Sequence, residues 1–251
     1  MKTANPLQND VLLYEPCHTL RFDAPFRWLK KGWQDFQSAP WHSLTYGAIF
    51  AGVALMLVYF SWSDSSYLLL GLPLSLLIVG PVLAFGLYDI SQQLELKRKP
   101  TFGHERMKAF HEMGHELMLA LLLSIAFLIM LIMISLVTNI GTTLGQLAVS
   151  AAVPVSGVVS LLIFAVFAGL FFCAGTFGLP MILDRDANAM TAMITSLHAV
   201  WRNKSVLTLW VLMILALTAV GFATALIGFV LIAPVLGYAT WHAYRETIIK
   251  E

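Results

Sequence analysis

The feature that most constrains this chain is its last long apolar stretch, Ser205 to Tyr244, which contains no lysine, arginine, aspartate or glutamate. The hydrocarbon core of a bilayer is about 30 Å thick and needs about twenty helical residues to cross it. The stretch is long enough for two crossings, and Gly221 and Gly228 lie near its middle. It therefore predicts a pair of transmembrane helices that turn near residues 222–225.

The composition extends this prediction to the whole chain. Hydrophobic residues make up 59% of it and charged residues 12%, and the mean hydropathy is +0.78. A soluble domain has about 25% charged residues. Four more apolar segments can cross a bilayer: His42–Phe60, Tyr67–Tyr88, Leu117–Thr138 and Val155–Met181. The predicted fold is an all-α membrane protein with six transmembrane helices arranged as three hairpins.

The positions of the basic residues predict the orientation. The 15 lysines and arginines all lie before the first span, in residues 91–116, in residues 184–204 or near the C-terminal end. The three intervening loops contain none. Basic residues are retained on the cytoplasmic side of a membrane, so both termini are predicted to be cytoplasmic.

An amphipathic segment precedes each predicted hairpin. In the first segment Phe26, Leu29, Trp33 and Phe36 recur at helical spacing, and Met107–Leu117 and Met190–Trp201 follow the same pattern. Each segment predicts a cytoplasmic helix lying in the membrane interface. The predicted organisation is a tail (1–25), one membrane domain (26–247) and a short end (248–251).

The three units also suggest an internal repeat over residues 26–90, 104–186 and 187–246. The returning helices carry Pro81, Pro180 and Pro234 at comparable places. The alternative is that hairpin proteins commonly have amphipathic linkers and some prolines. Small residues such as Gly169, Gly175 and Gly237 are expected to let helices pack closely.

One motif suggests chemistry. His111-Glu112-Met113-Gly114-His115 fits H-E-x-x-H, which on a helix places two histidines on one face to bind zinc, with the glutamate polarising a bound water. Asp184, or alternatively Asp186, is the candidate third ligand. The alternative is an interfacial helix whose polar side matches by chance. Haem is not expected, because the seven histidines lie outside the predicted spans or at their ends.

A second group of polar residues lies at the cytoplasmic ends of the returning helices: Asp89, Asp184, Arg185, Asp186, His242 and Arg245. Charges at such ends usually cap helices or pair with each other; a shared site or docking surface is the functional alternative. The span centres carry no ionisable residue, which argues against an ion-coupled transporter. A passive pore for a small solute stays open.

Three segments carry a family resemblance: Gly80-Pro81-Val82-Leu83-Ala84-Phe85-Gly86-Leu87-Tyr88-Asp89, Pro180-Met181-Ile182-Leu183-Asp184-Arg185-Asp186 and Pro234–Arg245. They resemble a family of bacterial six-span integral membrane proteins of unknown function. Some members carry the label of a cytochrome c oxidase subunit. The resemblance implies the bacterial inner membrane, but it implies no catalytic residue, and H-E-x-x-H is not part of the family pattern.

The sequence is best explained by a non-enzymatic accessory or scaffold subunit of a membrane complex, with a respiratory oxidase as one candidate. Its expected partners are the lipid bilayer and either other subunits or further copies of the chain, and no nucleic acid. A passive pore or transporter is the first alternative. A zinc-dependent membrane protease that uses His111, Glu112 and His115 is the second.

Overall fold

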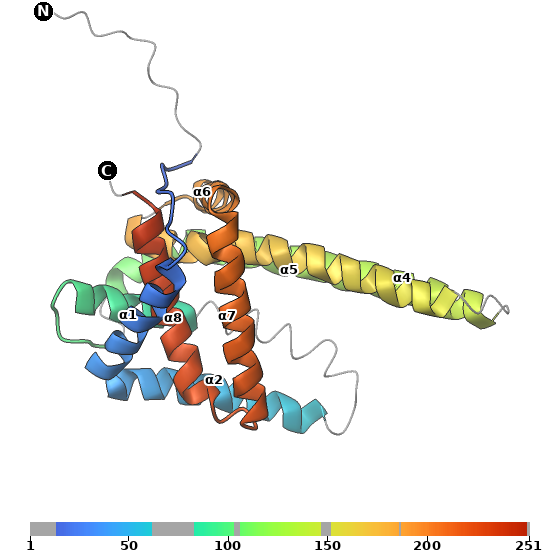
Figure 1. Cartoon of the computed structure of the whole chain (residues 1–251), viewed down its shortest axis with the longest axis horizontal. Coiled ribbons are helices and arrows are strands. Elements are labelled where there is room, and N and C mark those ends of the chain that lie inside the picture. The colour runs from blue at the N-terminus through green and yellow to red at the C-terminus, as the bar shows by residue number, and fades with distance from the viewer. Residues whose placement is uncertain (1–13, 62–82, 103–105, 147–151, 186, 250–251) are drawn as a thin grey trace, which may run out of the picture.

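The structure is a computed structural model that describes residues 14–61, 83–102, 106–146, 152–185 and 187–249. The side chains of residues 106–121 and of a few other helical positions lie outside this description. The bounded helices are α1 (Ala24–Ser38), α2 (Pro40–Ser61), α4 (Arg106–Gln146), α5 (Ala152–Arg185), α6 (Ala189–Arg202), α7 (Lys204–Ala223) and α8 (Phe229–Thr247). Residues 83–95 are also helical. The predicted all-α class is thus confirmed for the described residues (Figure 1).

Three of the described segments are long and apolar enough to cross a membrane. They are Ile125–Thr143 in α4, Val155–Arg185 in α5 and Lys204–Ala223, which is α7. The predicted second span, Tyr67–Tyr88, lies outside the described residues as far as Val82. The count of six spans stays a prediction.

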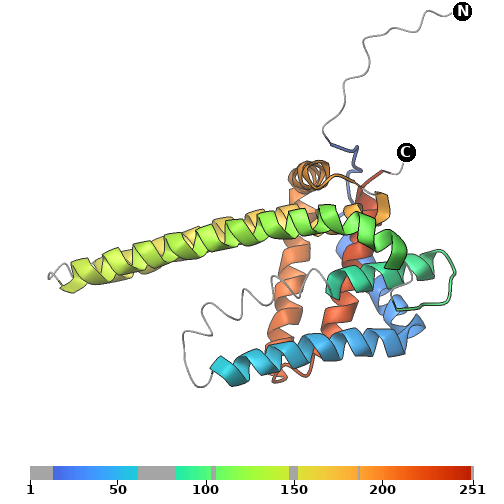
Figure 2. The ribbon, with the colours of Figure 1, turned by 180° about the vertical axis from the view of Figure 1, so that it is seen from behind.

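Helices α4 and α5 form an antiparallel hairpin that projects away from the other helices (Figures 1 and 2). With 41 and 34 residues, they are about 60 and 50 Å long at 1.5 Å per residue. The hairpin is therefore longer than a hydrocarbon core of about 30 Å, so its ends would extend beyond a bilayer that it crosses upright.

The structure corrects the expected start and end of this hairpin. The prediction of a separate interfacial helix over Met107–Leu117 was wrong, because α4 runs without a break from Arg106 into the span. The prediction that a loop begins at Asn139 was also wrong as far as Gln146, since residues 139–146 continue the helix. No proline lies in α4, and an isolated glycine such as Gly114 costs a helix only about 1 kcal/mol relative to alanine.

The other two amphipathic segments form separate helices, as predicted. Ala39 interrupts the helix between α1 and α2, because the proline at position 40 disfavours a helical conformation in the residue before it. Asn203 separates α6 from α7. The plan of a short amphipathic helix followed by an apolar one therefore occurs twice, and the threefold repeat stays a prediction.

One side of α1 is buried against the protein, and it includes Phe36 from the predicted membrane-facing side. Trp28, Gly32 and Phe36, spaced four residues apart, pack against the rest of the fold, mainly α8. Trp28 also makes an edge-to-face contact with Trp210 of α7, with 5.6 Å between ring centroids. Phe26 and Trp33 point outward. Helix α1 is thus docked on the bundle by one side and presents aromatic rings on another.

Close packing occurs at several of the expected glycines, such as Gly86, Gly221 and Gly237, and also at Gly47, which was not predicted. At Gly47 in α2, an added Cβ would lie 2.0 Å from the backbone oxygen of Val230, so only glycine fits against α8. Gly237 does pack closely, against Leu87, whereas Gly169 and Gly175 have open space around them. The expectation of close packing was therefore wrong for these two residues within the chain.

The turn between α7 and α8 lies where the sequence predicts it. Helix α7 ends at Ala223 and α8 begins at Phe229. Ala225 and Leu226 have φ values of 52° and 70°, a left-handed conformation uncommon for residues other than glycine. The Thr224 hydroxyl accepts a hydrogen bond from the Gly228 N–H at 2.9 Å, which helps to close the turn.

Candidate functional site

The main polar site forms where helix 83–95, α5 and α8 end close together. Its centre is Asp184, whose side chain is only 4% exposed. The Tyr244 hydroxyl donates to this carboxylate at 2.9 Å, Arg245 Nη1 at 3.2 Å and Gln92 Nε2 at 3.3 Å. These three donors, with the positive charges of Arg245 and of Arg185, whose Nε lies 3.7 Å from the carboxylate, compensate for its burial.

Arg245 extends this network to the end of helix 83–95. Its Nε lies 3.1 Å from Oε2 of Glu95, which also accepts a hydrogen bond from Trp241 Nε1 at 3.3 Å. Burial alone would lower the pKa of Arg245. The hydrogen bond to Glu95 and the charges of Glu95 and Asp184 outweigh burial and raise the pKa above its ordinary value. Arg245 is therefore a fixed cation between two carboxylates.

Arg185 connects the network to both ends of the described chain. Its Nη1 lies 3.4 Å from Oε2 of Glu15, and its Nη2 donates to the backbone oxygen of Ile249 at 2.7 Å. The backbone N–H of Glu15 in turn donates to the Thr195 hydroxyl of α6 at 3.0 Å. The part of the predicted tail from residue 14 onward is thus held against the fold.

A second cluster joins α1, α8 and helix 83–95. The Asp35 carboxylate lies 2.8 Å from His242 Nε2 and also accepts a hydrogen bond from the Ser91 hydroxyl. A Ser-His-Asp triad places histidine between the other two groups so that it can take the serine proton. Here the carboxylate lies in the middle. The arrangement therefore connects three helices and does not activate Ser91.

The predicted cytoplasmic residues thus divide between different neighbours. Asp184, Arg185 and Arg245 come together, whereas His242 binds Asp35 and Asp89 accepts a hydrogen bond from Gln93 at 2.9 Å. Asp186 lies outside the described residues. The sequence did not identify several members of the two clusters: Glu15, Asp35, Ser91, Gln92 and Glu95. Their polar character at helix ends was the available signal.

The H-E-x-x-H motif lies on the helical backbone of α4, but the side chains of His111, Glu112 and His115 are outside the description. The candidate third ligand, Asp184, already accepts hydrogen bonds from Tyr244, Arg245 and Gln92. Among the described residues, no three His, Cys, Asp or Glu side chains are close enough to hold a metal ion. Zinc binding by this motif stays an untested prediction.

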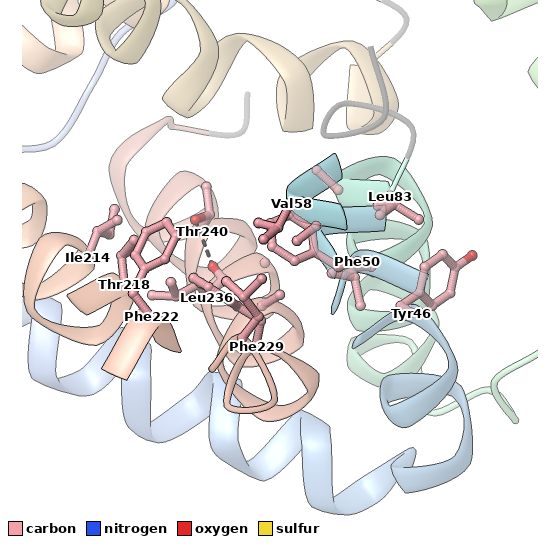
Figure 3. A pocket seen from close by; sticks show the side chains of 16 residues that line it. Tyr46, Phe50, Val58, Leu83, Ile214, Thr218, Phe222, Phe229, Leu236 and Thr240 are labelled. Carbon is pink, nitrogen blue, oxygen red and sulfur yellow. Dashed lines mark hydrogen bonds between the residues drawn. The ribbon is translucent and has the colours of Figure 1, made fainter. Parts of the chain in front are cut away.

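An apolar cavity of about 320 Å³ lies between α2, helix 83–95, α7 and α8 (Figure 3). Phe50, Phe222, Phe229 and Leu236 are among the side chains around it. The Thr240 hydroxyl on its wall donates to the backbone oxygen of Leu236 at 2.8 Å. The lining is mostly apolar, with the hydroxyls of Tyr46, Thr218 and Thr240 as its polar side-chain groups, and it suits an apolar group.

Comparison with known proteins finds a family similarity over part of the chain. Residues 68–184 match the model of a family described as "Predicted integral membrane protein (DUF2189)". No curated protein and no solved structure matches the chain. Over residues 68–184 the chain is similar to this membrane family of unknown function. The predicted resemblance to such a family is thus confirmed.

The match to DUF2189 covers only part of the polar site. It includes Gln92, Glu95 and Asp184, whereas Asp35, Tyr244 and Arg245 lie outside it. It also includes the whole α4–α5 hairpin as far as Asp184. The family assignment therefore supports lipid contact for this hairpin and leaves the role of the polar site to be argued from its geometry.

Proposed function

We propose that this DUF2189 protein is a non-enzymatic accessory or scaffold subunit of a membrane complex. The observation that carries the proposal is the α4–α5 hairpin. Away from the other helices, its two helices pack on each other and expose apolar side chains such as Ile132 and Leu161, both 66% exposed. A protein that held only its own fold together would not need such an arm, whereas a scaffold needs an apolar surface for neighbouring helices.

The polar site supports a structural role. Each acidic side chain that the structure describes has a hydrogen-bond or ion-pair partner: Glu15, Asp23, Asp35, Asp89, Glu95, Asp184 and Glu246. A catalytic carboxylate must exchange a proton or attack a substrate. A carboxylate that is already held by hydrogen bonds and ion pairs is poorly suited to either task. The network is better suited to fixing the relative positions of helices.

The proposed arrangement has six crossings and both termini in the cytoplasm of a bacterial cell. The support is the distribution of basic residues, which are confined to the segments on one side. The described basic residues fit this distribution. Lys97, Arg98 and Lys99 follow helix 83–95, and Lys204 begins α7. The inner membrane follows from the bacterial character of the resembling family.

The test is affinity purification of the tagged full chain from its native membrane in mild detergent, followed by mass spectrometry. We expect stoichiometric recovery of a defined complex, and the oxidase label makes a respiratory oxidase the first one to look for. Recovery of the chain alone from several mild detergents would contradict the proposal. Zinc content and solute flux in liposomes would then test the protease and the pore.

A variant on the hairpin sharpens this test. Gly169→Leu has room within the chain, because nothing lies within 4 Å of an added Cβ. It would block the close approach of a helix from another subunit, so we expect it to lower recovery of the partner. Leu170→Met on the same exposed segment conserves volume and is the matched control. Equal loss in both variants would indicate a general folding defect.

A further inference from the structure

A short basic turn follows helix 83–95. Lys97, Arg98 and Lys99 are consecutive and exposed, and two large apolar residues flank them. Leu96 is 56% exposed and Phe102 is 51% exposed. In Figure 1 the turn lies at the left edge, far from the tip of the α4–α5 hairpin. The turn therefore combines three cations with two apolar side chains that contribute little to the core.

The turn is held in a defined shape. The Gln93 side chain is buried, and it accepts a hydrogen bond from the Thr101 N–H at 2.9 Å while donating to the Thr101 backbone oxygen at 3.2 Å. The backbone N–H of Arg98 donates to the backbone oxygen of Gln93 at 2.8 Å. These bonds fix both ends of the turn, so the cations are presented without a large ordering cost.

The turn is also attached to the first turn of α2. The ring of Phe102 lies 4.4 Å from that of His42 and 6.0 Å from that of Tyr46, measured between centroids. The neighbouring Trp41 is 75% exposed. Leu96, Phe102 and Trp41 therefore accompany the three cations, and we call these six residues the basic turn surface.

The charge of this surface is not compensated within the described part of the chain. The acidic side chains there are held by other partners, mainly arginines such as Arg27, Arg185 and Arg245. None of them forms an ion pair with Lys97, Arg98 or Lys99. The surface thus keeps a local charge of about three positive units, since lysine and arginine are protonated at neutral pH.

We propose that the basic turn surface binds the headgroups of anionic phospholipids. Clusters of basic residues next to a membrane-spanning helix attract anionic lipid at about 1 kcal/mol per cation, which is about fivefold in affinity. Tryptophan and other large apolar residues beside them enter the interface. The combination fits a lipid surface better than an acidic protein, which would leave these apolar residues without a matching environment. The inference rests on the proposed cytoplasmic placement of the turn.

The test uses the purified full chain in phosphatidylcholine vesicles. Brominated phosphatidylglycerol or brominated phosphatidylcholine is added at equal mole fractions, and quenching of tryptophan fluorescence is recorded. Trp41 directly precedes His42, whose ring contacts Phe102 of the turn, and a Trp41→Phe variant identifies its part of the signal. We expect a relative affinity for phosphatidylglycerol over phosphatidylcholine that is at least about fivefold and falls at high salt, because ions screen exposed charges.

The variant Lys97→Asn/Arg98→Gln/Lys99→Gln should abolish this preference. Asparagine is used at position 97 because Lys97 has a φ of 55°, which asparagine tolerates well. The charge-conserving control Arg98→Lys/Lys99→Arg should keep the preference, and circular dichroism should show equal helix content in both variants. Equal quenching by the two lipids, or an unchanged preference in the neutral variant, would overturn the proposal. Because no other subunit is present, this outcome is independent of the co-purification test.

Discussion

At the scale of single residues, Arg245 has the clearest structural task. It is the cation that Asp184 and Glu95 share, and its side chain is about one-quarter exposed. Removing one partner from a buried pair costs about 3–5 kcal/mol, whereas an exposed pair contributes about 0–1 kcal/mol. For Arg245→Gln we therefore expect a loss of about 2 kcal/mol, seen as a lower thermal unfolding midpoint in detergent.

Arg21→Gln is the matched control for this substitution. Arg21 also forms an ion pair, with Asp23 at 3.4 Å, but both side chains are largely exposed. We expect its unfolding midpoint to stay close to that of the wild type. If both variants unfolded at the same temperature, the Asp184 network would contribute no more than a surface ion pair.

Asp23 allows a prediction about pH. The hydrogen bond from Arg27 lowers the pKa of Asp23 below its ordinary value. The folded state therefore releases this proton more readily than the unfolded state, so the pair stabilises the fold above the ordinary pKa of about 3.9 and loses this effect as the pH falls through the lowered pKa. The difference in unfolding midpoint between the wild type and Asp23→Asn should be present at neutral pH and shrink below pH of about 4. A difference that grows in acid would contradict the assignment.

The sequence located part of the polar site for a physical reason. Charges are costly inside a bilayer, so Asp184, Arg185 and Arg245 had to lie at the ends of apolar segments. It could not identify Glu95 as the partner of Arg245, because the two are 150 positions apart and meet only through helix packing. Asp35 was missed for the same reason, since nothing local indicates that α1 docks beside His242.

At the scale of helices, the α2–α8 contact depends on one glycine. An added Cβ at Gly47 would overlap the backbone of Val230, whereas Gly52, five residues later on the same helix, has nothing within 4 Å. We expect Gly47→Ala to destabilise the protein by about 1–3 kcal/mol through overpacking. Gly52→Ala should stabilise it by up to about 1 kcal/mol, because alanine is the better helix former. The measurement is the unfolding midpoint of each variant in detergent, compared with the wild type. If both variants shifted it in the same direction, the contact would not be formed as described.

The sequence was a good guide to helices and a poorer guide to their faces and ends. Apolar runs and Gly221 and Gly228 placed the α7–α8 turn well, because a turn between two spans must leave the bilayer. Phe26, Leu29, Trp33 and Phe36 were read as one membrane-facing side, but the bundle buries Phe36 and leaves Phe26 and Trp33 outside. An amphipathic pattern records that a side is apolar and does not record whether lipid or protein covers it.

At the scale of the whole molecule, the unsettled feature is how the helices cross the bilayer. In Figure 1, α7 and α8 run across the direction of the α4–α5 hairpin. Helix α7 has 20 residues, a length of about 30 Å that matches one crossing. Helix α8 carries Trp241, Arg245 and Glu246 in its last turns, so its apolar part is shorter. If α7 and α8 both span the bilayer, the positive-inside rule nevertheless places the α7–α8 turn on the side opposite Lys99 and Lys204.

Single cysteines labelled in intact cells decide this arrangement. Gln146→Cys at the end of α4 and Ile227→Cys in the α7–α8 turn are exposed positions, and Lys99→Cys lies in the basic turn. With six crossings, a membrane-impermeant maleimide should label the first two from outside and label position 99 only after permeabilisation. In that arrangement the positive-inside rule sets the side of the membrane for all three positions. Ile227→Cys is the position that tests this for α7 and α8. If it reacted only after permeabilisation while Gln146→Cys reacted from outside, α7 and α8 would lie on the cytoplasmic side, and the positive-inside argument would hold for the α4–α5 hairpin alone.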